Sequence, residues 1–444
     1  MTNNVSRREF VKLVGATSLL AVLPKSFRSA HSLKPITREW ITTGYEIPEL
    51  VSFDNTMRDF MQARNVSGGA LAVTRNSKLV LARGYTYSDD YEDIIVQPTS
   101  LFRIASISKP ITATAVLRLV QDNQLDLSAK LTVILTLTPP SGQTPDPRLS
   151  DITVLNLLQH LGGWDPKISF DPMRSDFAIA GALGVSLPIS KTDIATYMTG
   201  QALQHTPGTT YAYSNYGYSL VGQIIEQITG QAYQDYVNQK VFRSLEVTQT
   251  QLGRTLPEFR LSNEVKYHSQ YSESTVFDNT GSVVPQPYGA FNVENYDSHG
   301  GWLASAVDLA RFASTFDDPS TSPVLSQSSV NMMFALPENI DPGDYVPGHK
   351  YYACGWKVRD WGSGVRNTWH GGSLSGTHTL MVRLWDGLNW CVLFNQRDDP
   401  SGLPYGEIDN LLHAAADAVS SWPDHDLFDE YLLRERVYLP IIIK

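Results

Sequence analysis

Segments with the pattern of β-strands lie near both ends of this chain, and the long stretch between them is mainly helical. Residues 69–85 predict two strands joined by a turn at Asn76-Ser77. Three further segments have strand patterns: residues 351–358, 377–384 and 390–396. Helical patterns cover residues 50–65, 216–228, 303–315 and 408–420. This order predicts an α/β protein of the α+β type, with one antiparallel sheet built from both termini, flanking helices and an inserted, mostly helical domain.

The same order gives the expected domain boundaries. Residues 45–111 and 300–422 are expected to form the sheet domain, and residues 112–299 the inserted helical domain. Within the insert, residues 253–299 show little periodicity, and irregular stretches of that length are usually functional or disordered. Aromatic residues there favour a pocket wall over disorder: Tyr267, Tyr271, Tyr288, Phe291 and Tyr296. Residues 423–444 form a C-terminal tail that is expected to pack on the body.

The first 30 residues have the pattern of a twin-arginine export signal. Arg7-Arg8 precedes an apolar run from Leu13 to Leu23, which is too short to span a bilayer comfortably. A short amphipathic helix is the alternative, but adjacent arginines before such a run favour the signal. We therefore expect export to the periplasm, the cell surface or the medium, with no stable membrane span apart from the signal.

Composition excludes some classes of function. The net charge is −10, the isoelectric point is near 5.5, and no Lys/Arg-rich run occurs, which argues against a nucleic-acid partner. Two cysteines, Cys354 and Cys391, cannot form a disulfide framework or a cysteine-based zinc site. Buried free thiols are the expected state, and a disulfide between neighbouring strands is the alternative. No motif calls for a metal or any other cofactor.

A serine and a lysine three residues apart form the first chemical motif. Ser106 and Lys109 lie at the start of a predicted helix, where this spacing places both side chains on one face. A serine hydroxyl needs a base to become nucleophilic, and a nearby amine of lowered pKa can take its proton. An N-cap serine followed by an ordinary surface lysine is the alternative for an isolated S-x-x-K.

Two further segments can complete an acyl-transfer site. Tyr213 and Asn215 form a Y-x-N motif in a turn just ahead of a helix, and His370-Gly371-Gly372-Ser373 precedes a predicted strand. A serine–lysine pair, an ordered tyrosine and a glycine pair supply a nucleophile, bases and a close backbone approach. Other copies of these patterns are assigned to packing or connecting segments: Tyr236-Val237-Asn238, His160-Leu161-Gly162 and His299-Gly300-Gly301.

With these three motifs in order, the chain resembles the serine β-lactamase and penicillin-binding-protein superfamily, and in particular its class C β-lactamase-like branch. That branch also holds D,D-peptidases, D-aminopeptidases and certain carboxylesterases. The resemblance runs from about residue 50 to about 420 and includes two connecting segments, residues 152–160 and 300–305. It implies a β-lactamase/transpeptidase-like fold.

The resemblance also implies roles for the matching residues. Ser106 would be the acylated nucleophile, Lys109 its proton partner, and Tyr213 a general base or acid. Asn215 would bond Lys109 or a substrate amide. The His370-Gly371-Gly372 segment would replace the family's K-T-G, and the N–H groups of Ser106 and Ser373 would form the oxyanion hole.

Three functions remain open at this point. The first is a secreted serine hydrolase that cleaves small ester, amide or peptide substrates through an acyl-enzyme. The second is a β-lactamase or D-Ala-D-Ala carboxypeptidase, and the third is a penicillin-binding or sensing protein that acylates but turns over poorly. Lactam-cleaving relatives commonly carry lysine where this chain has His370, and a neutral imidazole attracts a substrate carboxylate less strongly. We therefore favour uncharged esters or amides, unless an arginine elsewhere supplies the charge.

Overall fold

The computed structural model describes residues 39–88 and 94–431. The segment assigned to a twin-arginine signal lies outside these residues, as does the C-terminal tail beyond residue 431, so the export signal stays a prediction.

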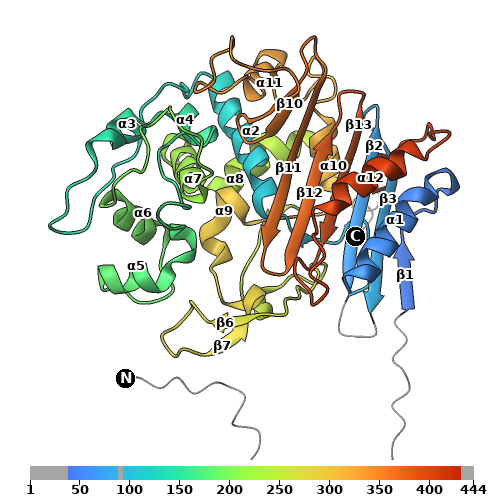
Figure 1. Ribbon diagram of the computed structural model, residues 1–444, viewed down its shortest axis with the longest axis horizontal. Coiled ribbons are helices and arrows are strands. Elements are labelled where there is room, and N and C mark those ends of the chain that lie inside the picture. Colours follow the sequence, from blue (N-terminus) through green and yellow to red (C-terminus); the bar gives the residue numbers. More distant parts are fainter. Residues whose placement is uncertain (1–38, 89–93, 432–444) are drawn as a thin grey trace, which may run out of the picture. The chain divides into compact units, whose positions relative to one another are not determined.

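The main sheet joins strands from the two ends of the chain, as predicted. Strand β13 pairs with β2, with Phe394 opposite Gly69, so the C-terminal strands continue the N-terminal hairpin (Figure 1). Every pairing in the sheet is antiparallel. The strand order is β1 (Glu39–Thr43), β3 (Lys78–Ser88), β2 (Gly68–Arg75), β13 (Leu388–Phe394), β12 (Thr377–Arg383), β11 (Arg366–Leu374), β10 (Lys357–Asp360) and β9 (Lys350–Tyr352). The fold-class prediction is thereby confirmed.

Helices cover both faces of this sheet. On one face lie α1 (Val51–Ala63) and α12 (Glu407–Asp417), whose apolar side chains pack on Leu71, Val73 and Trp390 (Figure 1). On the other face, α10 (Ala306–Ser314) packs against β13 and β2. Because both faces are covered, β13 is buried along its whole length, which explains its nearly continuous apolar sequence.

Helix α2 (Ser108–Gln121) joins the sheet to the helical region. Its residues from Ser108 to Leu117 are all buried, since it packs among helices as well as beside the sheet. The helices around and beyond it are α3 (Leu131–Ile134), α4 (Val154–Leu158), α5 (Asp176–Leu183), α6 (Lys191–Thr199), α7 (Asn215–Thr229), α8 (Tyr233–Val237), α9 (Asp297–Gly300) and α11 (Gln327–Met333). Five short strands form two small sheets: β4 (Phe102–Arg103), β8 (Trp302–Ala304) and β5 (Gln251–Leu252), then β6 (Ser272–Ser274) and β7 (Val283–Pro285).

One strand prediction was wrong in detail, and one strand was missed. The single strand expected at residues 351–358 is the hairpin of β9 and β10, which turns at Gly355 with a φ of +80°. A Cβ at Gly355 would collide with the carbonyl oxygen of Lys109, so the turn packs closely on α2. The His370-Gly371-Gly372 motif precedes the predicted strand at β12, as expected, but it also lies inside a strand that was not predicted, β11. Two glycines have low strand propensity, which concealed β11 in the sequence.

The cysteines and the described part of the tail behave as expected. Cys354 and Cys391 are buried free thiols. Cys391 lies in β13, whereas Cys354 lies in the bend between β9 and β10 rather than in a strand. The tail covers the edge of β3, where the Leu427 N–H donates to the Leu79 carbonyl.

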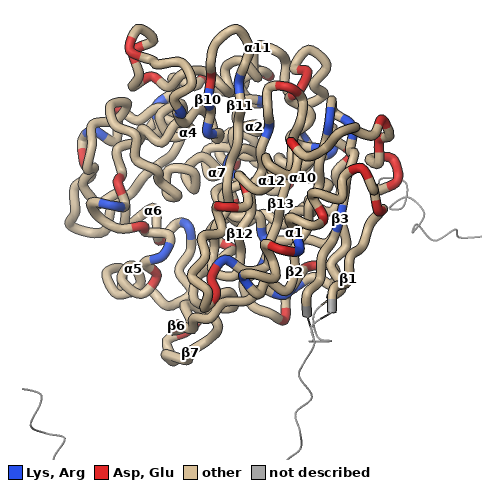
Figure 2. The backbone as a smooth tube through the Cα atoms, turned by 45° about the vertical axis from the view of Figure 1, so that its right-hand side comes forward, with Lys and Arg blue, Asp and Glu red and all other residues tan. Residues whose placement is uncertain are grey.

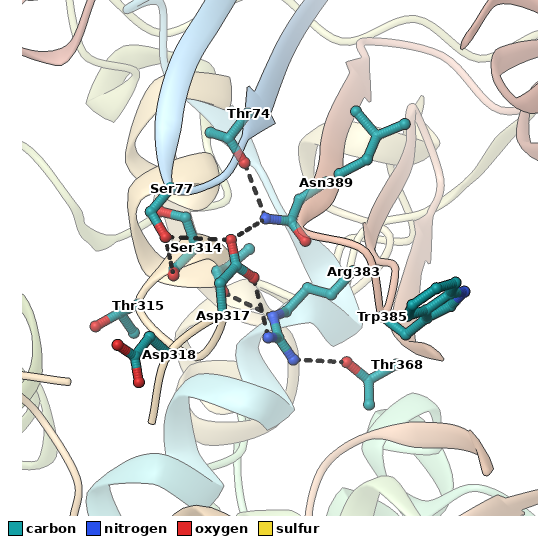
Figure 3. A network of polar contacts seen from close by, with 12 residues as sticks. Thr74, Ser77, Ser314, Thr315, Asp317, Asp318, Thr368, Arg383, Trp385 and Asn389 are labelled. Carbon is teal, nitrogen blue, oxygen red and sulfur yellow. Dashed lines mark hydrogen bonds and ion pairs between the residues drawn. The ribbon is translucent and has the colours of Figure 1, made fainter. Parts of the chain in front are cut away.

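A buried ion pair ties α10 to the sheet (Figure 3). Arg383 on β12 donates to the carbonyl of Ala313 at 2.8 Å and to Asp317 at 3.1 Å. Asn389 on β13 donates to Asp317 at 2.8 Å and to Thr74 on β2 at 2.9 Å. The side chains of Arg383 and Asp317 are each only 8% exposed, so removing either one leaves an unpaired buried charge.

We expect Asp317→Ala to lower the free energy of unfolding by roughly 3–5 kcal/mol, because the Arg383 guanidinium then stays buried without its partner. Asp424→Ala is the control, since its ion pair with Lys78 is exposed and should leave the melting temperature unchanged. Chemical denaturation of both variants measures this. Equal stability of the two variants would show that the buried pair does not hold α10 in place.

Candidate active site

Ser106 lies on a short 3-10 turn, Ala105–Ile107, between β4 and α2. The residue before it, Ala105, has a φ of +49°, a left-handed conformation that costs energy for a residue with a Cβ. Ser106 is partly exposed, while Ala105 and Ile107 are buried. The strained turn therefore presents one hydroxyl at the surface of the core.

Lys109 is fully buried, and its amine contacts three oxygen atoms. The Nζ–O distances are 3.1 Å to Ser106 Oγ, 2.9 Å to Asn215 Oδ1 and 2.8 Å to the His299 carbonyl. Burial lowers the pKa of Lys109 well below its ordinary value, against the opposing effect of Asp171. The amide and carbonyl oxygens only accept, so a neutral amine fills both with its two N–H groups. Its lone pair then remains for the Ser106 hydroxyl.

Tyr213 approaches Ser106 from the other side. Its hydroxyl lies 2.9 Å from Ser106 Oγ, and its ring centroid lies 4.7 Å from the Lys109 amine. Burial raises the pKa of the Tyr213 phenol, although the hydrogen bond to Ser106 opposes this. Tyr213 therefore stays protonated, and its O–H group donates a hydrogen bond to Ser106 Oγ.

Asn215 is held by a residue that sequence analysis missed. It is the first residue of α7, and its Nδ2 donates to Asp171 Oδ2 at 2.8 Å. This bond fixes the orientation of the amide, so that Oδ1 faces Lys109. Asp171 precedes Pro172 and caps a 3-10 turn. This Asp-Pro pair is the only sequence signal that could have drawn attention to Asp171, and it is common at turns without a catalytic role.

His370 uses both ring nitrogens within the protein. Its Nδ1 lies 2.8 Å from the Gly371 carbonyl, which can only accept, so the proton is on Nδ1. Its Nε2 therefore accepts from the Tyr352 hydroxyl at 3.0 Å. Burial and the neighbouring Lys109 lower the pKa of His370 well below its ordinary value, which keeps the ring neutral. Sequence analysis did not identify Tyr352, whose position depends on the β9–β10 hairpin.

Gly372 brings β11 against the turn that carries Ser106. A Cβ at Gly372 would overlap the Ile104 carbonyl oxygen and Thr379 Oγ1, whereas a Cβ at Gly371 meets nothing closer than 3.6 Å. Only glycine at position 372 therefore allows this approach. The next residue, Ser373, accepts a hydrogen bond from Arg397 Nη1 at 3.1 Å, so an arginine does lie beside the motif.

The alternative motif copies divide into two groups. Tyr236 lies buried in α8 as a packing residue, as expected. His160 and His299, however, lie at the site. The Nδ1 of His160 accepts from the Ser214 N–H at 3.1 Å, and its ring packs 4.2 Å from that of Tyr213. His160 therefore supports the turn that holds Tyr213, and His299 contributes its carbonyl to Lys109.

Within the described residues, no group of three metal-ligating side chains occurs, and no helix is long and apolar enough to cross a membrane.

A family model for β-lactamases matches residues 53–415. Protein flp of Staphylococcus aureus (strain COL) is 27% identical over 202 residues, which cover 46% of this chain but only 38% of flp. The structure of D-amino acid amidase from Ochrobactrum anthropi SV3 matches with a TM-score of 0.63 and 23% identity, over 84% of this chain and 99% of the amidase. EstCE1, described as a hydrolase with promiscuous acyltransferase activity, matches with a TM-score of 0.62 and 17% identity, over 84% of this chain and 99% of EstCE1.

The family match covers most of the chain, and the chain therefore belongs to the β-lactamase family. At these identities the two solved structures establish the fold alone.

We expect Gly372→Ala to reduce covalent labelling of Ser106 by a fluorophosphonate probe about a hundredfold, because a shift of β11 by about 1 Å misplaces the reacting groups. Gly371→Ala is the matched control, since its added methyl group has room. Labelling rates and circular dichroism of both variants test this. A Gly372→Ala protein that labels like the control would refute the close-approach argument.

Proposed function

We propose that this protein is an exported serine hydrolase that cleaves esters or small amides through an acyl-enzyme at Ser106. The observation that carries the proposal is the position of Ser106 Oγ, 3.1 Å from the Lys109 amine and 2.9 Å from the Tyr213 hydroxyl. A buried neutral amine and a protonated phenol on one serine provide a base and a proton donor for acyl transfer.

In the proposed acylation step, Ser106 Oγ attacks the substrate carbonyl while its proton passes to the Lys109 amine. The N–H groups of Ser106 and Ser373 are proposed to stabilise the oxyanion. When the tetrahedral intermediate collapses, Tyr213 donates its proton to the leaving oxygen or nitrogen and regains one from Lys109. In deacylation, water attacks the acyl-enzyme and its proton passes to the neutral Lys109 amine. Ser106 Oγ then leaves and takes up a proton from Lys109 or from Tyr213, which Lys109 reprotonates.

The neutral state of His370 supports the preference for uncharged substrates. Its only N–H is used by the Gly371 carbonyl, and its other nitrogen accepts from Tyr352. The ring therefore has neither a charge nor a free donor for a carboxylate next to the scissile bond. Arg397 is the competing cation, but it already donates to Ser373 and lies 4.0 Å from Asp398.

We expect Ser106→Ala to abolish turnover and fluorophosphonate labelling, and Tyr213→Phe to lower the acylation rate by about a hundred- to ten-thousandfold. Tyr236→Phe is the control, since this buried tyrosine belongs to the competing Y-x-N motif. Stopped-flow acylation with p-nitrophenyl acetate measures these rates. A larger loss in Tyr236→Phe, or labelling that survives on another residue, would contradict the assignment.

The twin-arginine segment predicts the location of the protein. Changing Arg7 and Arg8 together to lysine should retain the protein in the cytoplasm, as measured by cell fractionation. Normal export of this variant would contradict the proposed route.

We expect a higher kcat/KM for p-nitrophenyl acetate and butyrate than for nitrocefin at pH 7, because nitrocefin places a carboxylate near the neutral His370. Arg397→Gln tests whether the arginine binds the nitrocefin carboxylate. This variant should turn over nitrocefin still more slowly, and the esters should remain the better substrates. A kcat/KM for nitrocefin equal to or above that for the esters would overturn the ester hypothesis.

A further inference from the structure

A cavity of about 430 Å³ lies beside the candidate active site. Its walls include the rings of Tyr211 and Tyr352, the apolar side chain of Ile340, and two lysines, Lys350 and Lys357. A space of this size can hold a small aromatic or amide-containing group. The mechanism proposed above uses neither lysine.

Tyr352 connects the cavity to the reacting groups. Its hydroxyl bonds His370, and its ring lies 6.1 Å from the ring of Tyr213. In the proposed mechanism Tyr213 gives its proton to the leaving atom, so the leaving group extends on the Tyr213 side. Two groups mark the opposite ends of the His370–Ser373 motif along β11. Arg397 contacts Ser373 at one end, and the β9–β10 hairpin that carries Tyr352 pairs with Trp369 at the other end. The cavity therefore lies on the leaving-group side.

The charged walls of the cavity are all positive. Figure 2 shows basic and acidic positions interspersed along the chain, but among the described residues that line this space only Lys350 and Lys357 are charged. Both lysines pair with neighbouring strands through their backbones, but no ion pair or hydrogen bond joins the side-chain amine of either lysine to another described residue. Burial, with the nearby charge of Lys350, lowers the pKa of Lys357. An anion between them would relieve the repulsion and supply the missing partner.

The two lysines and the two aromatic rings together indicate the chemistry of a ligand that fits this cavity. Two ammonium groups and two aromatic walls suit a carboxylate attached to an aromatic unit.

We propose that this cavity binds the leaving group of the substrate and selects leaving groups that end in a carboxylate held by Lys350 and Lys357. The proposal rests on the acyl-enzyme function proposed above. In this arrangement the carboxylate of the leaving group lies in the cavity lined by Tyr352, and not next to His370 at the scissile bond. The preferred substrate class is an ester or amide that is uncharged at the reacting centre and whose leaving group carries an acid at its far end.

Paired esters test this selection. The first pair, 3-acetoxybenzoate and 3-acetoxybenzamide, differs only in the charge of the leaving group. We expect kcat/KM to favour the carboxylate about tenfold, as for a hydrogen bond to a charged group. Lys350→Gln combined with Lys357→Gln should bring the ratio near one, while Lys130→Gln, an exposed lysine elsewhere, should keep it. A ratio that the double variant leaves unchanged would overturn the proposal.

A second pair tests which half of the substrate enters the cavity. The esters 4-nitrophenyl hemisuccinate and 4-nitrophenyl succinamate differ in charge on the acyl half. They should show no preference that depends on the two lysines. A lysine-dependent preference for the hemisuccinate alone would place the cavity on the acyl side and contradict the proposal.

Binding to Ser106→Ala separates this inference from the proposed function. Calorimetry should give a lower Kd for 3-hydroxybenzoate than for 3-hydroxybenzamide, and the difference should vanish when both lysines are replaced in that background. If this holds while no ester is hydrolysed, the acyl-enzyme function fails and the anion-binding cavity stands. Equal Kd values for the two compounds would overturn the cavity proposal whatever the hydrolysis shows.

Discussion

The rest of the site depends on how the buried amine of Lys109 is accommodated. A charged ammonium without water is costly, so the fold must either pair it with a charge or keep it neutral. Here its partners are an amide oxygen on α7 and a carbonyl on α9, both uncharged acceptors. The same two bonds orient the amine so that its third position faces Ser106, and in the neutral amine this position is the lone pair. Stability and chemical reactivity therefore rest on one set of contacts, which brings three helices together around one nitrogen atom.

Much of this arrangement could be predicted from the sequence because its chemistry is local. The spacing of Ser106 and Lys109 places Ser106 on the 3-10 turn that leads into α2 and Lys109 on the first turn of α2, and the turn before α7 fixes Tyr213 relative to Asn215. The sheet was predictable because its strands form long apolar or alternating runs. These patterns depend on a few neighbouring residues, so one sequence suffices to detect them.

The missed residues act through contacts between distant segments. Asp171 orients Asn215 from 44 positions away, and His160 supports Tyr213 from a different loop. Tyr352 reaches His370 only because β9 and β10 form a hairpin that turns against α2. β11 was missed because the glycines that allow it to approach Ser106 also weaken its strand pattern. In each case the functional geometry required residues whose local pattern is uninformative.

The positions of the cations link the third motif to the substrate class. A lysine in place of His370 would put a charge next to the reacting carbonyl, and it would also lie near Lys109, where it would further disfavour protonation of that amine. The histidine avoids this repulsion, since its proton on Nδ1 is bound to a carbonyl and its ring stays neutral. Tyr352 bonds the His370 ring and lines the neighbouring cavity, whose lining also includes Lys350 and Lys357. In the proposed arrangement, moving the positive charge outward keeps Lys109 basic and shifts recognition of an anion from the scissile bond to the distal end of the leaving group.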